Sequence, residues 1–142
     1  MKVERMPQEL MQVMYTSTHG GVSEEELQSL SEEVFDLNAR YDIGGLLVIG
    51  EEYFLVILEG DPIVVTTFLI KNAKDPRHHS LNILLAGSTK GRVFQGWKVR
   101  ELKEGEPDKI FSEIGIKISE LNHKEIEKPR LERIILDLSK AI

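Results

Sequence analysis

The sequence predicts an α+β fold in which two helices connect the strands of one sheet. Segment 9–17 alternates side chains between two sides, as a strand with two different faces does. Segment 24–40 instead carries apolar residues at i, i+3, i+7 and i+10, which is typical of an amphipathic helix. Two apolar runs, 43–49 and 53–59, flank Gly50-Glu51-Glu52, a spacing that indicates a β-hairpin. These observations predict the order β-α-β-β.

Both helices have start signals in the sequence. Ser23 is followed three residues later by Glu26, which forms a capping box at the start of the first helix. Asp61 precedes Pro62, and this pair is typical of an N-cap followed by proline in the first helical turn. The second helix is therefore expected to begin at residue 62.

The second helix is followed by two more strands. It is expected to run to about Lys74, because Pro76 cannot continue it. Segments 81–88 and 97–102 are the fourth and fifth strands. The order β-α-β-β-α-β-β is most simply built as a ferredoxin-like sheet with both helices on one face.

Composition narrows the class of protein. The chain has 142 residues, 18 Lys and Arg, 24 Asp and Glu, no Cys and a net charge of −6. This charge argues against nucleic-acid and anionic-membrane partners, and the missing cysteine excludes disulfide and thiol chemistry. The longest apolar run, Phe54–Leu58, is too short to span a bilayer, and the charged segment Met1–Pro7 is no signal sequence. A cytoplasmic protein is expected.

The composition changes after Leu102. Gly105-Glu106-Pro107 is typical of a linker, so we expect a domain over 8–103 and a helical extension over 104–142. Two helices separated by Pro129 are expected in the extension, which either covers the free face of the sheet or mediates dimerisation. Their apolar positions are Ile110, Ile114, Leu121, Leu131, Ile134, Ile135 and Leu138.

The densest polar cluster is Asp75, Arg77, His78 and His79. General acid–base or metal chemistry is one interpretation of it, and a solvated helix exit is the other. No second His or carboxylate pair has ligand spacing, so no metal site is predicted.

Basic residues dominate the region 70–100, where Asp75 is the one acid. Their concentration within an acidic chain indicates a local anion site, such as one for a phosphate. They are Lys71, Lys74, Arg77, Lys90, Arg92, Lys98 and Arg100. The acidic residues of the first helix, between residues 24 and 36, are expected to form its solvated face.

Two further features have local explanations. Asn38, near the end of the first helix, is either a capping residue or a side chain directed at a ligand. Gly44-Gly45 inside a strand indicates a bulge or a close backbone approach.

The chain resembles the BLUF domains, small flavin-binding blue-light sensors, over about residues 10–100. The family's fold is a ferredoxin-like sheet with flavin between the two helices and C-terminal helices appended. The resemblance rests on the order and spacing of several short motifs. They are Tyr15 with Ser17, Asn38, Ile43-Gly44-Gly45-Leu46-Leu47, Phe54-Leu55-Val56-Ile57-Leu58-Glu59-Gly60, Asp75-Pro76-Arg77-His78, Arg92-Val93-Phe94 and Trp97.

This resemblance implies a cofactor and the residues that bind it. The cofactor would be FAD, with FMN or no flavin as the alternatives. Asn38 would hydrogen-bond the flavin ring, and Lys71 and Asp75 would face its polar edge. Arg77 and His78 would lie near the ribityl and phosphate end, which suits a guanidinium.

The resemblance also implies a signalling relay, and the chain departs from it. In the family a tyrosine donates an electron and a proton to excited flavin, and a glutamine between them rearranges. Tyr15 holds the tyrosine position, but the glutamine position is Val56, which has no donor or acceptor. The family's frequent Trp-Ser-Met is Trp97-Lys98-Val99 here, and Gly44 stands where threonine is common. The glutamine-dependent photocycle is therefore expected to be lost or altered.

Three functional hypotheses follow. The first is a flavin-binding regulatory protein, without enzymatic activity, that acts on an unidentified protein partner. The second is a flavin-free module that forms homo-oligomers through its C-terminal helices. The third is an acylphosphatase-like hydrolase that binds phosphate with Arg77 or Arg92, and it is disfavoured because segment 16–21 lacks the arginine of a phosphate-cradling loop.

Overall fold

The computed structural model describes residues 9–76, 79–102, 121 and 125–141. Arg77, His78, the expected linker 105–107 and the first expected C-terminal helix lie outside these residues, except for Leu121. The elements follow the expected order. They are β1 (Leu10–Thr18), α1 (Glu24–Tyr41), β2 (Gly44–Ile49), β3 (Tyr53–Gly60), α2 (Pro62–Lys74), β4 (His79–Thr89), β5 (Trp97–Glu101) and α5 (Lys128–Ala141).

The five strands form one mixed sheet in the order β4-β1-β3-β2-β5. β2 and β3 are an antiparallel hairpin, as expected, and Gly50 N–H closes its turn on the carbonyl of Tyr53 at 2.8 Å. β1 lies antiparallel between β3 and β4, whereas β5 pairs with β2 in parallel. The predicted α+β sheet with two helices on one face is confirmed.

Local capping explains where α1 and α2 begin. The Ser23 hydroxyl oxygen accepts a hydrogen bond from Glu26 N–H at 3.1 Å, as the capping box predicts. The Asp61 carboxylate accepts from the N–H groups of Ile63 and Val64 at 3.0 and 3.2 Å. α1 ends at Tyr41, and its C-cap Asp42 has a left-handed φ of 55°. The sequence signals thus fix both starts correctly.

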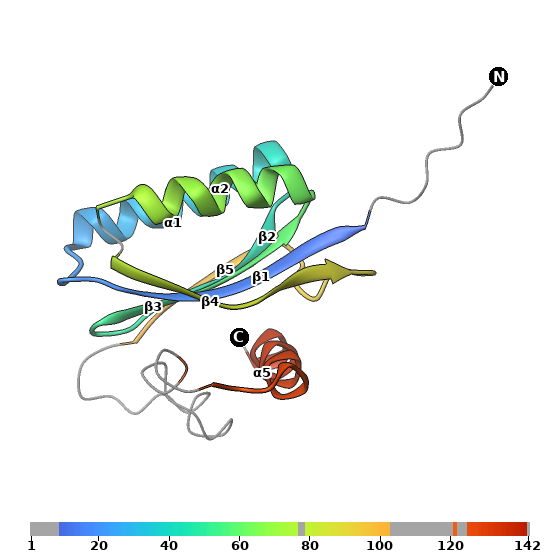
Figure 1. Cartoon of the computed structure of the whole chain (residues 1–142). Helices are drawn as coiled ribbons and strands as arrows, with labels where there is room; N and C mark the ends of the chain where they lie inside the picture. Colours follow the sequence, from blue (N-terminus) through green and yellow to red (C-terminus); the bar gives the residue numbers. More distant parts are fainter. Residues whose placement is uncertain (1–8, 77–78, 103–120, 122–124, 142) are drawn as a thin grey trace.

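Figure 1 shows α1 and α2 on one face of the sheet and α5 on the other, which gives two apolar layers. The helix-pair layer contains Val13, Tyr15 and Val56 from the central strands, together with Leu30 and Phe68 from the helices. The second layer joins strand residues to four buried positions of α5. These are Leu131, Ile134, Ile135 and Leu138. α5 therefore covers the free face of the sheet, which is one of the two roles expected for it.

Pro129 lies in the first turn of α5, where its missing N–H has no intrahelical partner to lose, and the helix expected before it lies outside the described residues. One expected boundary is wrong. β4 begins at His79 rather than at residue 81, because it continues its pairing with β1 as far as Thr18. The Thr18 hydroxyl donates to the carbonyl of His79 at 2.9 Å. His79 is therefore a strand residue rather than part of a helix exit.

The paired glycines of β2 permit close backbone approaches, as expected. Gly45 has a φ of 152°, and a Cβ atom there would lie 1.8 Å from the carbonyl oxygen of Ile57. Its N–H donates to the carbonyl of Gly96 at 3.0 Å, which holds the chain just before β5 against β2. A Cβ atom at Gly44 would lie 3.1 Å from the same carbonyl oxygen.

A buried carboxylate anchors the segment before β5. Glu59 accepts hydrogen bonds from the Gln12 amide at 2.8 Å and from the backbone N–H groups of Val93 and Phe94 at 3.0 and 2.8 Å. Arg92 donates to the Asp42 carbonyl at 2.7 Å and pairs with its carboxylate at 3.1 Å. These contacts fix the β4–β5 connection that leads into Trp97.

Within the described ranges, every helix is too short or too polar to serve as a membrane span.

Candidate functional site

The candidate site lies beneath α1 and α2, where Tyr15 and Val56 face the helices. Tyr15 is 1% exposed and stands directly opposite Val56 in the register of β1 and β3. Opposite residues of antiparallel strands point to the same face, so both side chains lie in the helix-pair layer. A residue at position 56 is therefore a direct neighbour of the tyrosine ring.

The Tyr15 hydroxyl has a partner from α2. The Asn72 amide Nδ2–H donates to Tyr15 Oη at 3.2 Å, and both groups are buried. Burial raises the pKa of the Tyr15 phenol well above its ordinary value, and the negative charges of Glu33 and Asp75 raise this pKa further. The Asn72 hydrogen bond lowers the pKa but does not outweigh burial. Tyr15 is consequently a neutral phenol throughout the physiological pH range.

A small cavity adjoins this hydrogen bond. Its volume is about 20 Å³, and Tyr15, Val56 and Asn72 are among its walls. Leu30, Leu47, Glu33, Val34 and Phe68 complete the lining. A space of this size holds about one water molecule. The apolar side chains of the two helices fill the rest of the space between the helices and the sheet.

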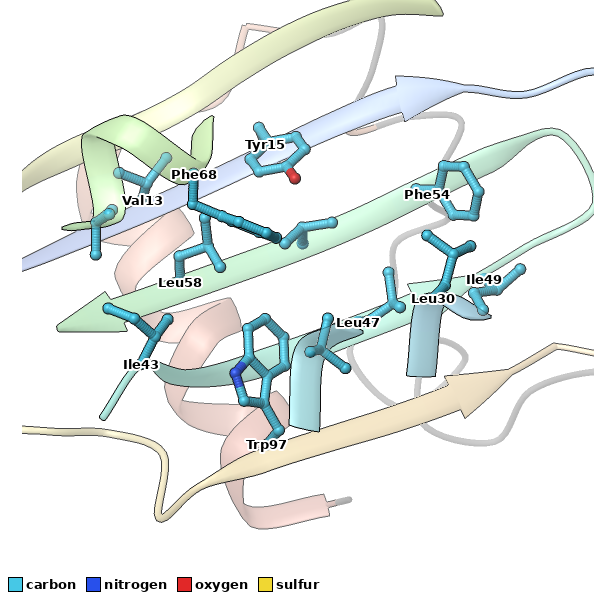
Figure 2. Packing of buried hydrophobic residues seen from close by; sticks show 13 residues of the cluster. Val13, Tyr15, Leu30, Ile43, Leu47, Ile49, Phe54, Leu58, Phe68 and Trp97 are labelled. Atoms are coloured by element: carbon cyan, nitrogen blue, oxygen red, sulfur yellow. The ribbon is translucent and has the colours of Figure 1, made fainter. Parts of the chain in front are cut away.

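Trp97 and Asn38 define the β5 side of the same layer. Figure 2 shows the Trp97 ring standing over the sheet beside Ile43 and Leu47, in the layer that also holds Tyr15 and Phe68. The Trp97 indole N–H is buried and has no hydrogen-bond partner among the described residues. Val99, two residues further along β5, packs against this layer and is partly buried. The structure thus brings Tyr15, Val56, Trp97 and Val99 to one face.

Asn38 is not the capping residue of α1, because Asp42 holds that position. The half-buried Asn38 amide lies 3.4 Å from the carbonyl oxygen of Ile43, at the start of β2. In that hydrogen bond the amide donates through Nδ2, so the amide oxygen takes no part in it.

Lys71 and Asp75, the other described residues that are expected to bind flavin, lie near the end of α2. The Lys71 ammonium is exposed and lies 3.7 Å from the Glu33 carboxylate. The half-buried Asp75 follows α2 directly, and its N–H donates to the Asn72 carbonyl at 3.1 Å. Arg77 and His78 lie outside the described residues, so their expected roles stay predictions.

Among the described basic residues of region 70–100, Lys71 and Arg92 have different partners. Lys71 pairs with Glu33 in the middle of α1, whereas Arg92 is engaged with Asp42, the C-cap of the same helix. Lys98 and Arg100 lie on β5, each with an interaction of its own. Their common sign therefore does not by itself predict one anion site. Within the described ranges, no group of His, Asp and Glu residues is arranged to hold a metal ion.

Sequence reasoning missed Asn72 and Glu33. Asn72 lies on the buried stripe of α2 with Val65 and Phe68, at i, i+3 and i+7. A polar residue on an apolar stripe was the available signal. Glu33 was assigned to the solvated face of α1, but it lies on the cavity wall beside Leu30 and Val34.

Comparisons with known proteins identify the family of this fold and site. The model of the BLUF family, described as sensors of blue-light using FAD, matches residues 10–100. The dark-state structure of BlrB, a BLUF protein, has a TM-score of 0.71 and 17% identity, with 95% of this chain and 98% of that chain covered. No curated protein matches.

Two larger proteins of known structure also match. A bacterial light-regulated adenylyl cyclase has a TM-score of 0.65 and 26% identity, over 74% of this chain and 32% of that chain. Klebsiella pneumoniae BlrP1, in a structure with FMN and cyclic diGMP, has a TM-score of 0.58 and 26% identity, over 66% of this chain and 25% of that chain. The chain thus spans less than a third of either protein.

The family match over residues 10–100 identifies a sensory domain of the flavin-using type. The chain belongs to the BLUF family, whose members use flavin to sense blue light. The family resemblance and the fold predicted from the sequence are thereby confirmed.

The residues of the helix-pair layer fit the chemistry of a flavin. A flavin ring presents apolar faces and an edge of carbonyl and N–H groups, which suit the apolar walls and the Asn38 amide. The partnerless Trp97 N–H is a buried donor that lacks an acceptor. Cavities that hold such ligands measure about 300 Å³ or more. The cavity of about 20 Å³ beside Tyr15 would have to widen to admit such a ring.

Proposed function

We propose that this chain is an FAD-binding sensory or regulatory protein whose glutamine-dependent blue-light photocycle is lost or altered. The observation that carries the proposal is the pairing of Tyr15 with Val56 across β1 and β3. A valine at this position offers the tyrosine hydroxyl neither a donor nor an acceptor. Bound flavin would supply the absorption of blue light.

The proposal assigns roles to residues on both sides of the helix-pair layer. Tyr15, Val56, Trp97 and Val99 occupy the relay positions, and their location on one face supports this assignment. Asn38 and a group at the end of α2 would bind the cofactor. That group consists of Lys71, Asp75, Arg77 and His78.

A second part of the proposal concerns activity and partners. The chain would act without catalysis, by transmitting a change at the helix-pair face to an unidentified protein partner or to a second copy of itself. The division into a sensor domain over 8–103 and an extension over 104–142 belongs to the proposal, and the packing of α5 on the sheet supports a transmitting role for the extension.

Titration of the purified protein with FAD tests flavin binding. Flavin that co-purifies, or that binds with quenched fluorescence, supports the proposal. Asn38→Leu should weaken binding about twofold to tenfold, because it removes one hydrogen-bonding amide. Gln28→Leu changes an exposed side chain of α1 and is the matched control. A protein that neither carries flavin nor takes it up contradicts the proposal.

The alternative is a flavin-free interaction module that forms homo-oligomers. The closed packing between the helices and the sheet favours it, because the cavity of about 20 Å³ is too small for a flavin ring without rearrangement. The same titration decides between the two functions. Light scattering on the full chain tests the assembly, and a monomeric mass would contradict it.

A further inference from the structure

The buried stripe of α2 contains an amide where packing alone would favour an apolar residue. Asn72 is 4% exposed and follows Val65 and Phe68 along the side of α2 that faces the sheet. Burial of an unpaired amide costs several times the net contribution of one hydrogen bond. The hydrogen bond from Asn72 Nδ2 to Tyr15 Oη at 3.2 Å offsets that cost. The amide and the phenol are therefore matched to each other.

The pair has two possible hydrogen-bonding states. When the Asn72 N–H donates to the Tyr15 oxygen, the phenol proton is left for a second acceptor. When the amide rotates by half a turn, its oxygen accepts the phenol proton instead. Val56, opposite Tyr15 on β3, can form neither kind of hydrogen bond with the phenol, because its side chain has no donor or acceptor.

The position of Asn72 relative to the cavity points to more than packing. Asn72, Tyr15 and Val56 line the same cavity, and Glu33 of α1 also lines it. The hydrogen bond from Asn72 thus joins α2 to β1 at the wall of this cavity. A change in the position of α2 relative to the sheet would alter this hydrogen bond.

We propose that Asn72 is a positioning residue for Tyr15, which supplies from α2 the amide that Val56 cannot supply from β3. The inference deepens the proposed function and rests on it where flavin is concerned. The hydrogen bond itself is independent of flavin, which allows the two to be tested separately.

Nuclear magnetic resonance of the flavin-free protein tests the pair. The side-chain amide signal of Asn72 should shift in Tyr15→Phe, which removes only the hydroxyl. Tyr41→Phe removes an exposed hydroxyl and is the matched control, for which no shift is expected. An Asn72 signal that stays unchanged in Tyr15→Phe would overturn the inference. This variant conserves the ring, so the test does not depend on a disruptive substitution.

A double-mutant cycle between Asn72→Leu and Tyr15→Phe measures the coupling. If the two side chains were independent, the effects of the single substitutions on the unfolding equilibrium constant would multiply in the double variant. We expect the measured constant of the double variant to differ from that product by about twofold to tenfold. Ala73→Leu places leucine at the next, exposed position of α2 and controls for the introduced side chain. Additive effects would overturn the inference.

FAD titration of the same variants separates the two claims. Coupling between Asn72 and Tyr15, together with FAD uptake, supports both the inference and the proposed function. Coupling in a protein that takes up no FAD supports the Asn72–Tyr15 pair and refutes the proposed function. FAD uptake without coupling refutes the role of Asn72 and leaves the proposed function standing.

Discussion

Tyr15 and Val56 face each other across β1 and β3, both almost fully buried beneath the two helices. The tyrosine hydroxyl instead meets the Asn72 amide, which comes from α2. The polar partner of the tyrosine thus lies on an element that packs on the sheet rather than on the sheet itself. Four predictions follow from this arrangement and from the packing that supports it.

The buried phenol predicts a pH dependence of stability. Because the pKa of Tyr15 is raised in the folded state, its contribution to the free energy of unfolding is complete below the unfolded pKa of about 10. Above that pH the unfolded chain loses the proton first, so this contribution falls by about 1.4 kcal/mol per pH unit. Urea unfolding of wild type and Tyr15→Phe at pH values from 8 to 11 measures it. Equal slopes for both proteins would contradict the prediction.

Gly45 should tolerate no side chain. Gly45→Ala forces a Cβ atom toward the carbonyl oxygen of Ile57 and places alanine at a φ of 152°. We expect the free energy of unfolding to fall by about 2–4 kcal/mol. Gly87→Ala on β4, where a Cβ atom would meet nothing within 4 Å, should change it by less than about 1 kcal/mol. A similar loss in both variants would contradict the close approach.

The packing of α5 can be tested with two adjacent residues. Ile135 is 1% exposed and packs in the layer on the free face of the sheet, whereas Leu136 is 44% exposed. Ile135→Ala should lower the free energy of unfolding by about 2–5 kcal/mol. Leu136→Ala should cost about 1 kcal/mol or less. Thermal or urea unfolding measures both, and equal costs would mean that α5 does not present this face to the sheet.

Local sequence signals predicted the fold well because they act over a few residues. Ser23 with Glu26 and Asp61 with Pro62 set the helix starts, and Gly44-Gly45 marked the close approach of β2. Such signals depend on backbone requirements that the chain meets locally. The start of β4 was wrong because it depends on pairing with β1, which lies far away in the sequence.

The candidate site was only partly predictable for the same reason. Tyr15 and Val56 were recognised from a family pattern, but the partner of Tyr15 was not, because 57 residues separate it from Asn72. Helical spacing places Asn72 on the buried side of α2 and cannot name the group that it meets. Arg92 shows the same limit, since its interaction with Asp42 depends on a connection whose path the sequence does not specify.

The light-minus-dark absorption difference spectrum of the FAD-loaded protein tests the central claim most directly. The account predicts that wild type lacks the family's ordinary reversible red shift. Val56→Gln should restore a red-shifted photoproduct that disappears in Val56→Gln with Tyr15→Phe, and Val56→Leu should resemble wild type. An ordinary reversible red shift in the wild-type protein would contradict the claim that the residue opposite Tyr15 has removed the glutamine-dependent response.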